Sequence, residues 1–272
     1  MSQQARTIAI CAPATPLTRE QASAVAELAA CDYPGLNLRF HEQCFAAEGH
    51  FAGGDEVRLA ALLECANDPQ VDAVWFAKGG YGCARIVAGF MAGLGEAAKG
   101  KTWLGYSDCG VLLGALYARG IGTAVHAPMP IDIKREDGEA AVRRTLDWLS
   151  GGMTGVEPSG DGLPRAAFNL MTLAMLAGTR FMPDLSGHEL LVEEVGEYEY
   201  AVDRLFFHVM ETVPGIAALR LGEVSAVPVN DRPFGAAIED IARYWCGRYG
   251  IEYRGRAAIG HSAANRIVPF GT

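Results

Sequence analysis

Short apolar segments alternate with helical patterns throughout the first half of the chain, and this alternation most limits how the chain can fold. Residues 71–77, 103–106 and 122–126 are apolar runs of strand length. Helical apolar spacing occupies residues 55–65, before the first run, and residues 139–149, after the last. Strands that alternate with helices form parallel sheets covered on both faces. The pattern therefore predicts an α/β fold whose N-terminal domain holds a parallel sheet.

The composition changes near the middle of the chain. Residues 150–165 are rich in Gly, Ser and Pro, which is typical of a linker. The sequence therefore predicts an N-terminal α/β domain over residues 1–149, a linker over 150–165 and a smaller C-terminal α/β domain over 166–272. We expect the two domains to meet in a cleft.

The predicted C-terminal domain contains further regular elements. We expect a helix over residues 169–178, a strand over 189–193 and a helix over 235–248. One more segment has apolar residues at i, i+3, i+4 and i+7, the spacing of a helix face that packs on a core: Val202, Leu205, Phe206 and Val209.

Charge and hydropathy exclude several classes of function. The 272 residues carry a formal net charge of −9, which disfavours a nucleic-acid partner because phosphate binding needs clustered Lys and Arg. No apolar run reaches the ~20 residues that span a bilayer, so no membrane partner is expected. The first residues lack the basic and long apolar regions of a signal peptide, and we expect a cytoplasmic protein.

The seven cysteines are scattered along the chain. They form no CxxC pair and have no metal-ligand spacing with histidine. We therefore expect reduced structural thiols, no metal site and no cofactor.

The segment around Ser107 combines the end of a strand with the start of a helix. A serine on such a turn is a nucleophile elbow, because its side chain projects at the strand end near helix N-terminal amides. Those amides can stabilise the oxyanion that forms when a nucleophile attacks a carbonyl. The second glycine of Gly-x-Ser-x-Gly is absent, however, and Ser107 is alternatively a helix N-cap.

A serine nucleophile needs a base and a carboxylate that orients the base. His261 follows a glycine that breaks an apolar segment, which suits projection into a cleft, although a structural histidine is the alternative. His126 follows a predicted strand and either lines a site or caps the strand end. Glu193 lies in a predicted buried strand, where a carboxylate needs a partner. It alternatively points outward from an edge strand.

Nine short motifs, read in order, resemble those of the LD-carboxypeptidase family of serine peptidases, which includes the microcin-immunity peptidases. They lie at residues 10–14, 51–58, 78–85, 105–108, 126–128, 169–170, 191–197, 202–204 and 260–261. The resemblance spans almost the whole chain. It implies a dimer and no cofactor.

The resemblance assigns roles to individual residues. It implies that Ser107 is the nucleophile, His261 the general base and Glu193 the orienting carboxylate. Oxyanion donors are expected at the backbone amides of Gly80 and Asp108. Glycines suit this task because they bring an amide close to the reacting centre without a Cβ. The substrate-binding candidates are Lys78, Tyr81, Arg85, Phe168 and Asn169, and Arg204 is a further cation that could bind a carboxylate.

The implied activity is hydrolysis of the amide between an L-centre and a terminal D-amino acid through an acyl-enzyme. The typical family substrate is cytoplasmic murein tetrapeptide. The alternative is an amide that joins an aspartyl residue to a nucleotide analogue, and Phe168 could stack on its base. Three other readings are less consistent with the sequence: a phosphate cradle at residues 79–82, an amidotransferase that uses Cys109, and a binding protein without activity.

Several positions depart from the family pattern. Lys78 replaces an Arg, Gly110 a Thr, and Glu194 an Asp, while Ala167 and Phe168 replace a pair of glycines. The sequence stops at Thr272, where family members generally continue into a further strand. The departures concern the substrate pocket, because Phe168 would fill space that glycines leave open.

Overall fold

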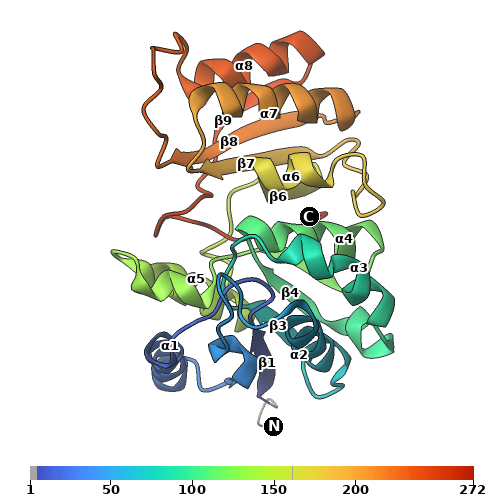
Figure 1. Ribbon diagram of the computed structural model, residues 1–272, viewed down its shortest axis with the longest axis vertical. Helices are drawn as coiled ribbons and strands as arrows, with labels where there is room; N and C mark the ends of the chain where they lie inside the picture. Colours follow the sequence, from blue (N-terminus) through green and yellow to red (C-terminus); the bar gives the residue numbers. More distant parts are fainter. Residues whose placement is uncertain (1–4, 161) are drawn as a thin grey trace.

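The computed structural model describes residues 5–160 and 162–272, which form two α/β units stacked along the long axis of the molecule (Figure 1). The first unit is built on a six-stranded sheet and the second on a four-stranded sheet. All strand pairings named in these sheets are parallel apart from one at an edge of the first. The predicted fold class is confirmed.

The first sheet has its apolar strands at the centre, as the sequence predicted for residues 71–77, 103–106 and 122–126. In order across the sheet, its strands are β10 (Val268–Pro269), β5 (Thr123–His126), β4 (Thr102–Gly105), β3 (Ala73–Phe76), β1 (Arg6–Cys11) and β2 (Leu36–Phe40). Trp75 on β3 and Trp103 on β4 are both fully buried. Strands buried on both faces are apolar throughout, which explains the continuous runs in the sequence.

Helices surround this sheet (Figure 1). They are α1 (Arg19–Asp32), α2 (Asp55–Asn67), α3 (Cys83–Gly93), α4 (Gly110–Ala118) and α5 (Gly138–Leu149), with short 3₁₀ helices η1 (Glu42–Phe45), η2 (Glu96–Gly100), η3 (Ser107–Cys109) and η4 (Pro130–Lys134). The helices predicted at residues 55–65 and 139–149 correspond to α2 and α5. No helix among the described residues is both long and apolar enough to cross a membrane.

The second sheet is parallel throughout. Its strands are β6 (Arg165–Asn169), β7 (Glu189–Val195), β8 (Ala218–Ser225) and β9 (Glu252–Arg256), and its helices are α6 (Leu170–Leu176), α7 (Glu199–Thr212) and α8 (Ile238–Tyr249). The predicted helix face on α7 packs inward, since Val202, Phe206 and Val209 are fully buried. The helix predicted over 235–248 begins three residues later, at Ile238, and ends at Tyr249.

The chain passes between the two units twice. It leaves the first unit after α5 and returns at the end, where β10 pairs with β5 in an antiparallel manner. Val156 in the predicted linker forms a bridge with Ile267, so the outgoing and returning segments also contact each other. The proposed domain limits stay a prediction. Residues 1–4 of the first predicted domain and residue 161 of the predicted linker lie outside the described residues.

Phe168 belongs to the packing between the two units, and its predicted role as a substrate contact is wrong. Its side chain is 1 % exposed and lies outside the residues that line the cavity described below. A Cβ added at Gly110 or at Gly114 on α4 would lie 3.4 Å and 3.3 Å, respectively, from the Phe168 ring. The ring therefore occupies space that two glycines leave open. Two departures from the family pattern, Phe168 in place of a glycine and Gly110 in place of a threonine, compensate each other.

We predict that Phe168→Ala destabilises the protein. Loss of a buried phenyl ring that cannot be replaced by neighbouring atoms costs about 3–5 kcal/mol. The control is Met175→Ala on α6, because Met175 is 50 % exposed and its loss should change stability by less than about 0.5 kcal/mol. Urea unfolding followed by circular dichroism measures both. Equal midpoints for Phe168→Ala and wild type would show that the ring does not support the interface.

Candidate active site

Ser107 lies on a sharp turn between β4 and α4. Its φ of 58° lies in the left-handed region, which residues other than glycine rarely adopt. Such a conformation persists only where the surrounding structure holds the backbone in place. Gly79 approaches this turn so closely that a Cβ there would lie 3.2 Å from the Ser107 hydroxyl oxygen. The local structure is that of a nucleophile elbow.

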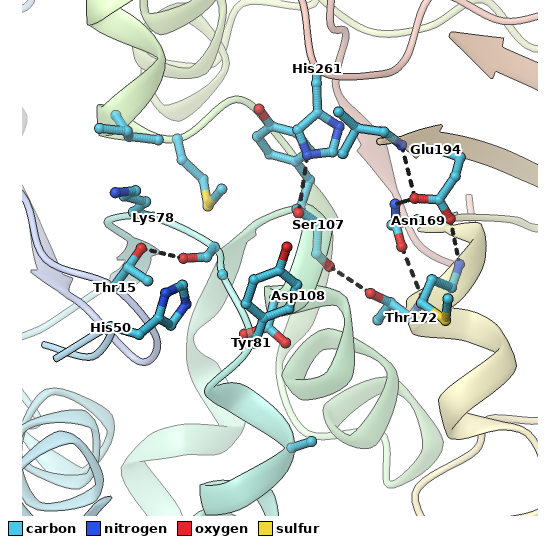
Figure 2. Close-up of a pocket in the computed structure, with 18 of the residues that line it drawn as sticks. Thr15, His50, Lys78, Tyr81, Ser107, Asp108, Asn169, Thr172, Glu194 and His261 are labelled. Atoms are coloured by element: carbon cyan, nitrogen blue, oxygen red, sulfur yellow. Dashed lines mark hydrogen bonds between the residues drawn. The ribbon is translucent and has the colours of Figure 1, made fainter. Parts of the chain in front are cut away.

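Hydrogen bonds join Ser107, His261 and Glu193 into one chain. His261 Nε2 lies 3.1 Å from Ser107 Oγ (Figure 2). The Nδ1 atom of the same ring lies 2.8 Å from Glu193 Oε2. Glu193 is fully buried on β7, with His261 as the partner of one carboxylate oxygen. Gly222 on the adjacent β8 provides room, because a Cβ there would lie 3.0 Å from the Glu193 Cβ. The three predicted residues therefore meet, although they come from both units.

A buried polar pair supports the segment that carries His261. Asn265 Oδ1 accepts a hydrogen bond from the backbone amide of Gly260 at 3.1 Å and lies 2.9 Å from His126 Nε2. Since this oxygen is an acceptor, His126 carries a proton on Nε2. His126 is at the end of β5 in the first unit. The sequence left its role open and carried no signal for Asn265.

The glycine turn beside Ser107, at residues 79–82, is fixed by hydrogen bonds with two buried side chains. Asp108 Oδ2 accepts hydrogen bonds from the backbone amides of Gly82 and Cys83, at 2.9 and 3.0 Å. The fully buried Arg58 donates to the carbonyl of Gly82 at 3.0 Å. Gly80 has a φ of 139°, a conformation that L side chains rarely adopt. Gly80 and Asp108, whose amides are predicted oxyanion donors, both line the cavity at Ser107.

Asn169 and Glu194 form the opposite wall of the site (Figure 2). Asn169 caps α6 by accepting from the amide of Thr172 at 3.0 Å, and its Nδ2 donates to Glu194 Oε1 at 2.8 Å. Glu194 also accepts from the amides of Met171 and Val195, each at 2.8 Å. Burial raises the pKa of Glu194, while these hydrogen bonds act in the opposite direction. Asn169 thus lines the cavity but is held by its neighbours.

A cavity of about 450 Å³ opens at Ser107 and His261. Lys78 and Tyr81, which the sequence proposed as substrate contacts, line it, and so do Lys134 and Arg135, which the sequence did not single out. Arg85 does not line it, and its role as a substrate contact stays a prediction.

Arg85 lies outside the cavity because its guanidinium group is used elsewhere. It is exposed and pairs with Asp55 of α2 at 2.7 Å. Within residues 5–160 and 162–272, no cluster of side chains could hold a metal ion.

Two parallel-sheet units whose junction carries a Ser–His–Glu hydrogen-bond chain define a two-domain α/β protein with the side-chain arrangement of a serine hydrolase. Family models agree with this class. The LD-carboxypeptidase N-terminal domain matches residues 8–127 and the LD-carboxypeptidase C-terminal domain matches residues 167–272, so the chain belongs to the LD-carboxypeptidase family. It is therefore a peptidase, a hydrolase of amide bonds.

Individual relatives align over almost the whole chain. The murein tetrapeptide carboxypeptidase of Pseudomonas aeruginosa is 28% identical, over 97% of this chain and 91% of that protein. The crystal structure of muramoyltetrapeptide carboxypeptidase from Oxalobacter formigenes is 25% identical with a TM-score of 0.79, and the match covers 97% of this chain and 92% of that one. The microcin C7 self-immunity protein in complex with aspartyl sulfamoyl adenosine is 16% identical with a TM-score of 0.79. The match covers 99% of this chain and 92% of that one, and the two proteins share the fold.

We predict that His126 makes stability depend on pH. Burial lowers its pKa, and the hydrogen bond to Asn265 acts in the opposite direction. The unfolded chain therefore takes up a proton near its ordinary pKa of about 6.5, whereas the folded chain does so only at lower pH. The contribution of neutral His126 to stability is complete above about pH 6.5 and is lost as the pH falls toward the folded-state pKa.

Melting temperatures between about pH 8 and about pH 5 test this prediction. His126→Gln, which keeps an amide donor for Asn265 but does not titrate, should show a shallower fall in Tm toward acid pH than wild type. An identical pH dependence in the two proteins would contradict it.

Proposed function

We propose that the protein is a serine-type LD-carboxypeptidase in which Ser107 is the nucleophile, His261 the general base and acid, and Glu193 the orienting carboxylate. The single observation that supports this most strongly is the hydrogen-bond chain of these side chains at the wall of a 450 Å³ cavity. A neutral imidazole whose Nδ1–H is bound to a carboxylate presents Nε2 as an acceptor, which is what a serine hydroxyl needs in order to lose its proton.

The reaction proceeds in two halves. Ser107 Oγ attacks the carbonyl carbon of the L-centre while its proton passes to His261 Nε2, and the carbonyl oxygen becomes an oxyanion. Amides of Gly80 and Asp108 bind that oxyanion. His261 then donates its proton to the departing amine as the C–N bond breaks, which leaves an acyl-enzyme. A water molecule, deprotonated by His261, attacks this ester, and the acid product leaves with Ser107 restored.

The buried carboxylate of Glu193 stabilises the imidazolium form of His261 in both halves. It also fixes the ring orientation, since a carboxylate in an apolar interior has a strong interaction with the charged ring. The hydrogen bond between His261 and one of its two oxygens offsets part of the cost of its burial.

Murein tetrapeptide is the substrate that we propose, with free D-alanine as the product. Two relatives that align over nearly the whole chain are called murein tetrapeptide carboxypeptidase and muramoyltetrapeptide carboxypeptidase. A cavity of this size admits the end of a peptide, and the charged side chains among its lining residues, such as Lys78 and Lys134, suit a charged substrate. We place the reaction in the cytoplasm, where such peptides are recycled, and the dimer stays a prediction.

The aminoacyl-nucleotide alternative loses the residue on which it depended. Phe168, which was to stack on a base, is buried in the interface between the units. The amidotransferase reading, which uses Cys109, is also disfavoured. The Cys109 side chain is fully buried and lies 3.7 Å from the carbonyl of Lys78, whereas His261 is bonded to Ser107.

We expect purified protein to release D-alanine from murein tetrapeptide, as followed by mass spectrometry. Ser107→Ala should lower kcat/KM by about 10⁴-fold or more, because no other side chain can replace the nucleophile. Glu193→Gln should lower it by about 10²-fold or more, because the amide cannot compensate the imidazolium charge.

A serine-directed phosphonate separates the parts of the proposal. Labelling at Ser107 without D-alanine release would retain the nucleophile but reject the substrate, and an aspartyl-nucleotide amide would be assayed next. The absence of both labelling and release would reject the serine mechanism. Cys109→Ala serves as a control that should retain activity, and loss of activity in that variant alone would favour the cysteine.

A further inference from the structure

One wall of the cavity carries cationic side chains from two segments of the first unit. Lys78 follows β3 and precedes the glycine turn, while Lys134 and Arg135 lie at the end of η4. Arg135 is engaged: its Nε donates to Asp132 at 2.7 Å and its Nη2 to the Tyr106 hydroxyl at 3.2 Å. The two lysines are not held in this way.

Neither lysine ammonium group has a hydrogen-bond or ion-pair partner within the part of the chain that the structure describes. Burial lowers the pKa of Lys78, and the nearby charge of Lys134 lowers it further. Two like charges beside one cavity repel each other when the cavity is empty, and a bound anion would remove that repulsion. The arrangement is therefore better suited to a complex with an anion than to the free protein.

The acidic side chains of the cavity do not neutralise these lysines. Asp108 accepts hydrogen bonds from backbone amides of the glycine turn, and Glu194 accepts them from groups of the second unit. Glu197 belongs to the segment after β7, in the second unit. In Figure 2, Lys78 lies on the opposite side of Ser107 from Asn169 and Glu194. One side of the cavity is thus cationic and the other acidic.

The cationic wall adjoins the histidine that must protonate the leaving amine. The ring of His261 lies 5.0 Å from that of Tyr106, whose hydroxyl donates to Asp132 at 2.8 Å. Lys134 lies between Asp132 and Arg135 in the sequence, so it borders the same region. In an amino acid, one carbon separates the amine from the carboxylate. A leaving amine at His261 therefore places its carboxylate inside this cavity, where the cationic wall attracts it and the acidic wall repels it.

We propose that Lys78 and Lys134 form a carboxylate subsite that binds the terminal carboxylate of the leaving amino acid. This inference rests on the proposed function and adds a reason for its exopeptidase character. Ammonium-to-carboxylate hydrogen bonds are stronger than neutral ones. A peptide whose last carboxylate is blocked or extended would leave both lysines unpaired, so the protein removes terminal residues and does not cleave within a chain.

The test compares two peptides, murein tetrapeptide with its free terminal D-alanine carboxylate and the same peptide ending in D-alaninamide. We expect wild type to prefer the carboxylate by about tenfold or more in kcat/KM. Lys78→Met and Lys134→Met should each reduce this preference severalfold, and the double variant should abolish it. The matched control is Lys99→Met, whose lysine is paired with Glu96 outside the cavity and should retain the preference.

A preference that is unchanged in the double variant would overturn the subsite while leaving the proposed function intact. If wild type hydrolyses neither peptide, the proposed function fails, and calorimetric binding of both peptides to Ser107→Ala decides the subsite separately. Tighter binding of the carboxylate peptide that is lost in the lysine variants would support it. Equal binding of the two peptides, or binding of neither, would reject it.

Discussion

The site depends on one contact between the two units, the 3.1 Å hydrogen bond from Ser107 in the first unit to His261 in the second. Proton transfer tolerates little error in such a distance, so the packing between the units is itself part of the reaction geometry. Two features fix that packing. Phe168 fills the space above the glycines of α4, and His126 shares the oxygen of Asn265 with the backbone next to His261.

The central elements of the fold could be predicted because their sequence patterns are local. The apolar runs that became β3, β4 and β5 are buried on both faces, and burial is what makes such runs apolar. The short edge strand β10 could not be predicted. It has only two residues, Val268–Pro269, and forms because β5 offers an open edge, a fact that the local sequence does not contain.

The candidate site was predicted unevenly for a similar reason. Motifs indicated Ser107, Glu193 and His261, and the structure brings these side chains together. A motif does not tell, however, whether a neighbouring side chain lines the cavity or packs in the core. Phe168 was misjudged because the space it fills is created by glycines far away in the sequence. Lys134 ends the short 3₁₀ helix η4 and Asn265 lies in an irregular segment, and neither stretch is long enough for a periodic pattern to show which side chains turn inward.

The return of β10 to the first sheet also orders the events of synthesis. Domains generally fold in sequence as they leave the ribosome. Here β5 keeps an unpaired edge until residues 268–269 have been made, long after the rest of its sheet. Exposed strand edges invite pairing with other chains. The nascent protein therefore passes through a stage in which its first unit is almost complete but one edge of the sheet is still unpaired. The strand that pairs with this edge is synthesised shortly after His261.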